Sequence, residues 1–283
     1  MLASVGLFIG YIAHIANLIR VATIITYVGD QSRRVLETRY PSDTPMSAPR
    51  QPLPAPVRTI PTPRAGVVVS VNDQVLARLA ADMGCVLVLA VRVGDFVPAG
   101  APLFAVHPHD ADVGTGAEDR QDRRIPEEVA LDTERTMEQD LAFGFRQLVD
   151  IVERALSPAV NDPTTASQAI DVLHDLLRAL ATRQLPDGRS WGQGGRLCLV
   201  VPQYGFGEFL DLAVGEIWRY GADAAQIPGR LAAMLADLDT AALPGYRPAI
   251  AGWAQRIGGA ATAAGGPPAA PAPGQAEGSS GTA

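Results

Sequence analysis

The sequence predicts an α+β protein with an N-terminal membrane or interface helix, a small β module, a mostly helical C-terminal domain and a disordered tail. Three observations lead to this prediction. The first 28 residues are almost all apolar, short valine-rich runs bounded by glycine and proline fill residues 65–108, and apolar residues recur every three or four positions from residue 126. Because 47% of the 283 residues are apolar, the chain can form a sizeable core.

Residues 1–39 are predicted to form one long helix. Leu2–Ile19 carries no formal charge, and about 20 apolar residues are needed to cross a bilayer. Beyond Arg20 the pattern becomes amphipathic, and Arg33, Arg34 and Arg39 follow. Because basic residues mark the cytoplasmic end of a span, we expect attachment to the inner (plasma) membrane, with residues after about 30 in the cytoplasm. The alternative is a long core or oligomerisation helix of a soluble domain.

Residues 40–64 contain eight prolines. Proline fixes φ and lacks an amide donor, so neither helix nor sheet is expected to persist there. The composition predicts a semi-extended linker or a segment that wraps over a surface.

Residues 65–108 are predicted to form the small β module. The runs Gly66–Val71, Cys85–Val93 and Pro102–Val106 are typical of strands. Between the first two, Asp73–Met83 has helical spacing, with Asp73 as the expected N-cap and Gly84 at the position after the helix.

The turn GDFVPAG before the third strand resembles that of lipoyl- or biotinyl-type barrel-sandwich domains, through Gly94, Asp95, Val97, Gly100 and Leu103. Those domains act through a modified lysine. All 23 basic residues here are arginine, so the carrier function is excluded and no cofactor is expected.

Residues 109–125 are predicted to be a polar linker, and the start of this region holds a cluster of possible metal ligands. His107, His109, Asp110 and Asp112 supply imidazoles and carboxylates that suit zinc or manganese. No further ligand follows at a telling spacing, so a solvated loop is the favoured interpretation and the metal site the alternative.

Residues 126–257 are predicted to be mostly helical. Gly144 falls on the apolar face of the first helix and would allow another helix to approach closely. That helix should end near Ser157, and Asp162 and Pro163 should cap and begin the next. The two apolar stripes comprise Met137, Leu141, Phe145, Leu148, Val152 and Leu156, then Ala166, Ala169, Ile170, Leu173, Leu177 and Leu180.

Polar residues around the corner SPAVNDP form the candidate binding site. A helix N-terminus there favours a carboxylate or phosphate. Each residue also has a structural task in capping, turn formation or ion pairing, and this second interpretation is favoured. The candidates are Arg135, Asp140, Asp150, Arg154, Ser157, Asn161, Asp162 and Thr165.

The remaining composition restricts the function. The net charge of −7 disfavours a nucleic-acid partner. Cys85 and Cys198 each lie in an apolar run and are expected to be buried, reduced thiols. Residues 258–283 are rich in Gly, Ala, Pro and Ser and are predicted to be disordered.

Several motifs together resemble one family. R-x-x-x-x-D-x-x-F-G (Arg135–Gly144), the stretch Leu148–Ala166, FIGYIAHIANLIRV near the start and GDFVPAGAPL are similar to domain-of-unknown-function family 2254, predicted bacterial membrane proteins. The resemblance covers Phe8 to about Leu238. It implies several transmembrane helices followed by a cytoplasmic part, of which this chain resembles the last span and the cytoplasmic region. It therefore implies a truncated or misassigned start, and it supplies no catalytic residues.

The expected function is that of a non-catalytic, membrane-attached cytoplasmic domain serving assembly, sensing or solute passage. The expected partners are the membrane and further copies of the chain, with an unknown ligand. One alternative is a metal-dependent hydrolase that uses His107 and His109. The other is a soluble oligomeric binding module whose first helix packs against its own copies.

Overall fold

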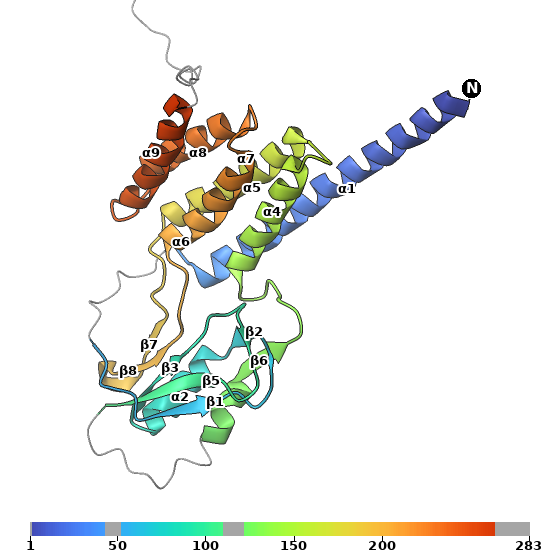
Figure 1. The fold of residues 1–283 in the computed structure, drawn as a ribbon. Helices are drawn as coiled ribbons and strands as arrows, with labels where there is room; N and C mark the ends of the chain where they lie inside the picture. The colour runs from blue at the N-terminus through green and yellow to red at the C-terminus, as the bar shows by residue number, and fades with distance from the viewer. Residues whose placement is uncertain (1, 43–51, 110–121, 264–283) are drawn as a thin grey trace, which may run out of the picture.

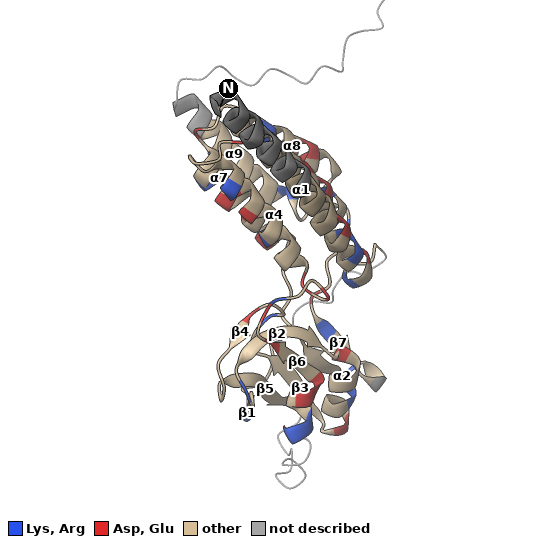
Figure 2. Ribbon diagram, turned by 90° about the vertical axis from the view of Figure 1, so that its right-hand side faces the viewer, with Lys and Arg blue, Asp and Glu red and all other residues tan. Residues whose placement is uncertain are grey.

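The computed structural model describes residues 2–42, 52–109 and 122–263, with side chains for all of these except residues 2–20, 193 and 260–263. Helices and two β-sheets make up the molecule, which confirms the predicted α+β class. A helical domain lies at one end and a β part at the other, joined by a narrow set of connecting segments (Figure 1). The same division is visible from the side (Figure 2).

Helix α1 runs without interruption over Leu2–Arg39, as predicted. Its C-terminal half packs against α4 (Leu141–Leu156) and α5 (Pro163–Ala181), and its N-terminal end stands clear of the other helices (Figure 1). Within the described part of the chain, no helix combines the length and hydropathy needed to cross a bilayer. The side chains of Leu2–Ile19 lie outside that part, so the predicted span is not confirmed.

Two glycines allow α1 to lie close to its neighbours. A Cβ on Gly29 would lie 2.7 Å from Cγ1 of Val172 on α5, and a Cβ on Gly144 of α4 would collide with Oγ of Ser32. The predicted close approach at Gly144 is therefore confirmed, and its partner is α1. Around these contacts α1 buries Val28 and Leu36 in the core of the helical domain.

Helices α4 and α5 follow the predicted apolar stripes from Leu141 onward, and these are buried apart from the partly buried Leu156. Met137, predicted on the first stripe, lies before α4, because that helix begins only after its cap at Asp140. Asp140 caps α4 and Asp162 caps α5, each through a side-chain oxygen that accepts an amide hydrogen three residues on. The predicted cap at Asp162 and the helix end at Ser157 are confirmed.

The rest of the helical domain comprises α6 (Phe206–Leu210), a π-helical turn (Asp211–Gly215), α7 (Glu216–Gly221), α8 (Ile227–Ala241) and α9 (Arg247–Ala263). Helix α9 corrects one prediction, because residues 258–263 of the predicted disordered tail are helical. Ile257 is still buried there, and the alanines that follow favour the helix. Residues 264–283 lie outside the described residues.

The β part contains helix α2 (Asp73–Asp82) and two sheets. The first sheet has the order β1 (Arg58–Pro61), β5 (Pro102–Pro108), β3 (Cys85–Leu89), β8 (Leu197–Val200) and β7 (Arg189–Trp191). The second has the order β4 (Phe96–Val97), β2 (Gly66–Val71) and β6 (Val129–Asp132). The predicted likeness to a barrel-sandwich domain is not confirmed by this pair of sheets.

Four strands lie where none was predicted. Strand β4 falls in the predicted turn GDFVPAG and pairs with β2. Strand β1 falls in the proline-rich segment and pairs with β5; as an edge strand it tolerates Pro61. Strand β6 falls in the region predicted to be helical, where VALD alternates between buried and exposed residues and pairs with β2. Strand β7 falls in the same region and pairs with β8.

Local details of the module agree with the sequence more closely. Gly84 has φ of +64° just after α2, as predicted, whereas the N-cap is Asn72 rather than Asp73. The Oδ1 atom of Asn72 accepts the Val75 amide hydrogen at 3.4 Å. Cys85 and Cys198 are free and buried, as expected, and burial raises the pKa of Cys85 to about 11.

Candidate functional site

Asp140 and Arg135 form an ion pair where the helical domain meets the β part. One carboxylate oxygen of Asp140 accepts hydrogen bonds from Nε and Nη2 of Arg135 at 3.0 and 2.7 Å, and the other accepts the Phe143 amide hydrogen at 3.0 Å. The Asp140 side chain is only 3% exposed. Burial raises the pKa of Asp140, although Arg135 and the Phe143 amide oppose that rise. We therefore assign this buried ion pair a structural role, as a joint between the helical domain and the β part.

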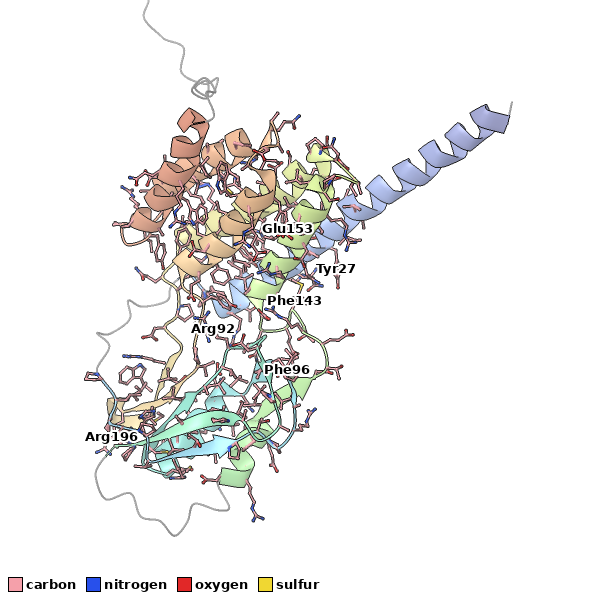
Figure 3. All side chains as sticks on the ribbon, viewed as in Figure 1. Tyr27, Arg92, Phe96, Phe143, Glu153 and Arg196 are labelled. Carbon is pink, nitrogen blue, oxygen red and sulfur yellow. The ribbon has the colours of Figure 1, made fainter. Side chains whose placement is uncertain are left out.

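A second contact joins the two parts nearby. Arg92 of the β part lies 2.7 Å from a carboxylate oxygen of Glu208 on α6, and its guanidinium sits 4.5 Å from the ring centre of Tyr204. Burial acts to raise the pKa of Glu208, but hydrogen bonds from the Gly205 amide and Arg92 hold it below its ordinary value. Figure 3 shows Arg92 and Phe143 at the boundary between the two parts.

The corner SPAVNDP uses most of its polar groups to hold its own shape. Ser157 donates its hydroxyl to the Arg154 carbonyl at 2.7 Å, and the Asn161 amide donates to the Ser157 carbonyl at 2.9 Å. Asn161 has φ of 47°, a conformation that asparagine tolerates. Asp162 accepts both the amide and the hydroxyl of Thr165, at 3.0 and 2.6 Å. Capping and turn formation thus account for Ser157, Asn161 and Asp162.

The eight candidate residues do not converge on one site. Arg135 and Asp140 lie at the start of α4 beside the β part, and the other six lie on or beyond its second half. The 16 residues of α4 separate the two ends by about 24 Å at 1.5 Å per residue.

Four candidate residues do share a hollow, of about 510 Å³, between α1 and the corner: Asp150, Arg154, Asp162 and Thr165. Its apolar wall comes from α1 and includes Val21, Ile24 and Val28. Sequence reasoning missed this wall because α1 and the corner lie more than 100 residues apart. It also missed Gln147, whose amide oxygen is buried in this region without a hydrogen-bond partner.

The charges at the rim of the hollow are not neutralised by one another. Asp150 and Arg154 are exposed, and neither forms an ion pair with a residue that the structure describes. The spacing of Arg146, Asp150 and Arg154 at intervals of four along α4 thus does not produce a ladder of ion pairs. Arg146 pairs instead with Glu216 of α7, and this hydrogen bond holds the pKa of Glu216 below its ordinary value.

The two histidines of the possible metal cluster bond to backbone carbonyls. Nδ1 of His107 lies 2.6 Å from the Pro54 carbonyl oxygen, and Nε2 of His109 lies 2.7 Å from that of Leu197. Asp110 and Asp112 lie outside the described residues. Within the described ranges, no three side chains form a group able to hold a metal ion.

A second hollow, of about 780 Å³, lies between α2 and the β7–β8 hairpin. Arg78, Arg196, His109 and the half-exposed Trp191 border it, and the small Ala77 and Ala81 leave it open. Figure 3 shows Arg196 in the β part, far from the helical domain. Apart from His109, the sequence pattern singled out none of these residues, because the hairpin lies in the region predicted to be mostly helical.

These features define a two-part α+β protein whose first helix links a charge-free N-terminal stretch to a helical domain and a β part. The chain belongs to domain-of-unknown-function family 2254, described as predicted membrane proteins, whose family model matches residues 1–237. It is 33% identical over 222 residues to uncharacterised proteins of Mycobacterium bovis and Mycobacterium tuberculosis. The match covers 77% of this chain and 42% of each relative, so the chain spans less than half their length. No solved structure matches it.

Proposed function

We propose that this chain is a non-catalytic domain attached to the inner (plasma) membrane through the N-terminal half of α1. The single observation that carries the proposal is that the charge-free stretch Leu2–Ile19 belongs to the same unbroken helix that packs into the helical domain. At about 1.5 Å per residue, these 18 residues extend about 27 Å, close to the hydrocarbon thickness of about 30 Å. The family description supports a membrane address.

The distribution of charge supports an orientation. The first charged residue is Arg20, and Arg33, Arg34 and Arg39 follow on the same helix, which favours this side as the cytoplasmic one. Residues after about 30, and with them the helical domain and the β part, are then cytoplasmic.

The contacts of α1 favour assembly or sensing as the role. Because Gly29 and Gly144 bring α1 into direct contact with α5 and α4, a displacement of the membrane helix acts on the helical domain. The joint at Asp140 passes that displacement to the β part. Solute passage needs more membrane spans than the N-terminal half of α1 provides.

Fractionation of cells that express the full chain tests the attachment. Wild-type protein is expected in the membrane fraction and resistant to alkaline carbonate, whereas the double variant Phe8→Asp/Ile12→Asp is expected in the soluble fraction because charge is costly in hydrocarbon. The control is Thr38→Asp, an exposed change on the packed half of α1. Wild-type protein that is wholly soluble, or a double variant that stays in membranes, would refute the proposal.

A further inference from the structure

We propose that the hollow between α1 and the SPAVNDP corner binds a zwitterionic phospholipid whose headgroup ends in a primary ammonium. The phosphate lies at Arg154, and the ammonium lies at Asp150. This inference rests on the proposed membrane attachment of α1 and adds a ligand to it.

The hollow lies where α1 enters the helical domain. Val21 and Ile24 line it, and they follow the charge-free stretch that ends at Ile19. At 1.5 Å per residue they lie about 3 and 8 Å beyond Ile19. The headgroup layer on each side of a bilayer is about 5–8 Å thick, so the hollow falls at headgroup depth.

The surface around the hollow suits a membrane interface. Ile24, Tyr27 and Val160 are 50%, 61% and 52% exposed, and Ile24 and Val160 line the hollow directly. Exposed large apolar residues are costly in water, and tyrosine is enriched at headgroup level, where its ring is partly dry and its hydroxyl wet. Figure 3 labels Tyr27 on α1.

The polar side of the hollow carries one cationic side chain, Arg154, and two carboxylates, Asp150 and Asp162. Asp150 and Arg154 are four residues apart, so they share one face of α4. Both are exposed, and neither forms an ion pair with a residue that the structure describes. Asp162 is already engaged with Thr165.

This pattern selects the headgroup. A phosphate fits the guanidinium of Arg154, but a purely anionic headgroup would bring its charge close to Asp150 and offer no ammonium. A primary ammonium donates a hydrogen bond to the carboxylate of Asp150, whereas the quaternary ammonium of phosphatidylcholine has no N–H to donate. The volume of about 510 Å³ is in the range of small-ligand sites.

Flotation of the purified full chain with lipid vesicles tests the proposal. Vesicles of phosphatidylcholine alone are compared with vesicles that contain phosphatidylethanolamine or phosphatidylglycerol at equal mole fraction. We expect phosphatidylethanolamine to strengthen binding about tenfold, since a charge-assisted hydrogen bond to Asp150 is gained. Asp150→Asn and Arg154→Gln are each expected to abolish this preference, and Arg247→Gln, an exposed arginine on α9, to retain it.

The outcomes separate this inference from the proposed function. Equal flotation with all three vesicle types would refute the headgroup site and leave membrane attachment standing. No flotation with any vesicle would refute both. A Tyr27→Cys variant that forms a disulfide-linked dimer and loses the lipid preference would overturn the proposal in favour of a second copy on this face. Thermal unfolding of each variant confirms that it is folded, which is expected because Asp150 and Arg154 are exposed.

Discussion

Gly94 of the β part lies directly against the carboxylate of Asp140 at the start of α4. A Cβ on Gly94 would collide with Oδ2 of Asp140 and lie 2.7 Å from Nη2 of Arg135. Gly94 also has φ of +95°, which other residues rarely adopt. The turn GDFVPAG thus provides one of the contacts that hold the β part against the helical domain.

Gly94→Ala is therefore expected to destabilise the protein by about 2–4 kcal/mol, through backbone strain and loss of the Asp140–Arg135 geometry. Urea unfolding measures this change. The matched control is Gly100→Ala in the same turn, where φ is +79° but no atom lies within 4 Å of the added Cβ. Gly100→Ala is expected to lower the free energy of unfolding by about 1 kcal/mol, because only the unfavourable φ contributes there. Equal costs at the two positions would contradict a packed joint at Gly94.

Gly144→Ala is expected to loosen α1 from α4, because the added Cβ meets Oγ of Ser32. We expect the free energy of unfolding to fall by about 1–3 kcal/mol, and amide hydrogen exchange between residues 25 and 36 to become faster. Ser32→Ala should recover part of this loss in the double variant, since it removes an oxygen that is buried without a partner. Gly252→Ala, in open space on α9, should instead stabilise by about 0.5–1 kcal/mol. No recovery on combining Gly144→Ala with Ser32→Ala would argue against this contact.

The ion pair of Arg146 with Glu216 predicts a pH dependence. The pKa of Glu216 is lowered in the folded protein, so its contribution is present above the unfolded value and is lost as pH falls through the folded pKa. Glu216→Gln should lower the free energy of unfolding by about 1 kcal/mol near neutral pH, and by progressively less below about pH 4.5. Chemical unfolding at pH values from 7 to 3 gives the free energy of unfolding of the wild type and of Glu216→Gln. Glu37→Gln, an exposed change on α1, is the control. A difference that stays constant over this range would disprove the linkage.

The histidines of β5 give a prediction about metal. Because His107 and His109 each bond to a carbonyl of another segment, replacing either with alanine is expected to cost about 1 kcal/mol of stability. Metal content of the purified protein, measured by mass spectrometry, is expected not to change in these variants. Stoichiometric zinc or manganese in the wild type that disappears in His107→Ala would instead support the metal-dependent hydrolase.

The sequence predicted well the parts of the fold that depend on near neighbours. The stripes of α4 and α5, the cap at Asp162 and the turn at Gly84 follow from spacings of a few residues. Strand β6 was missed because VALD is a strand only through its pairing with β2, about sixty residues earlier. The polar side of the hollow at the corner was predicted, because its residues belong to neighbouring segments, α4 and α5. The apolar residues that α1 contributes were not predicted, because α1 is distant in sequence.

The order of the strands also affects how the protein is made. In the first sheet, β3 lies between β5 and β8, yet β8 leaves the ribosome roughly 100 residues after β3, about 5–20 s later at ordinary elongation rates. During that interval one edge of β3 has no partner, whereas α1 has already emerged. A nascent chain held at a bilayer by α1 would complete its central sheet beside the membrane, away from other unfinished chains whose strand edges it would otherwise pair with.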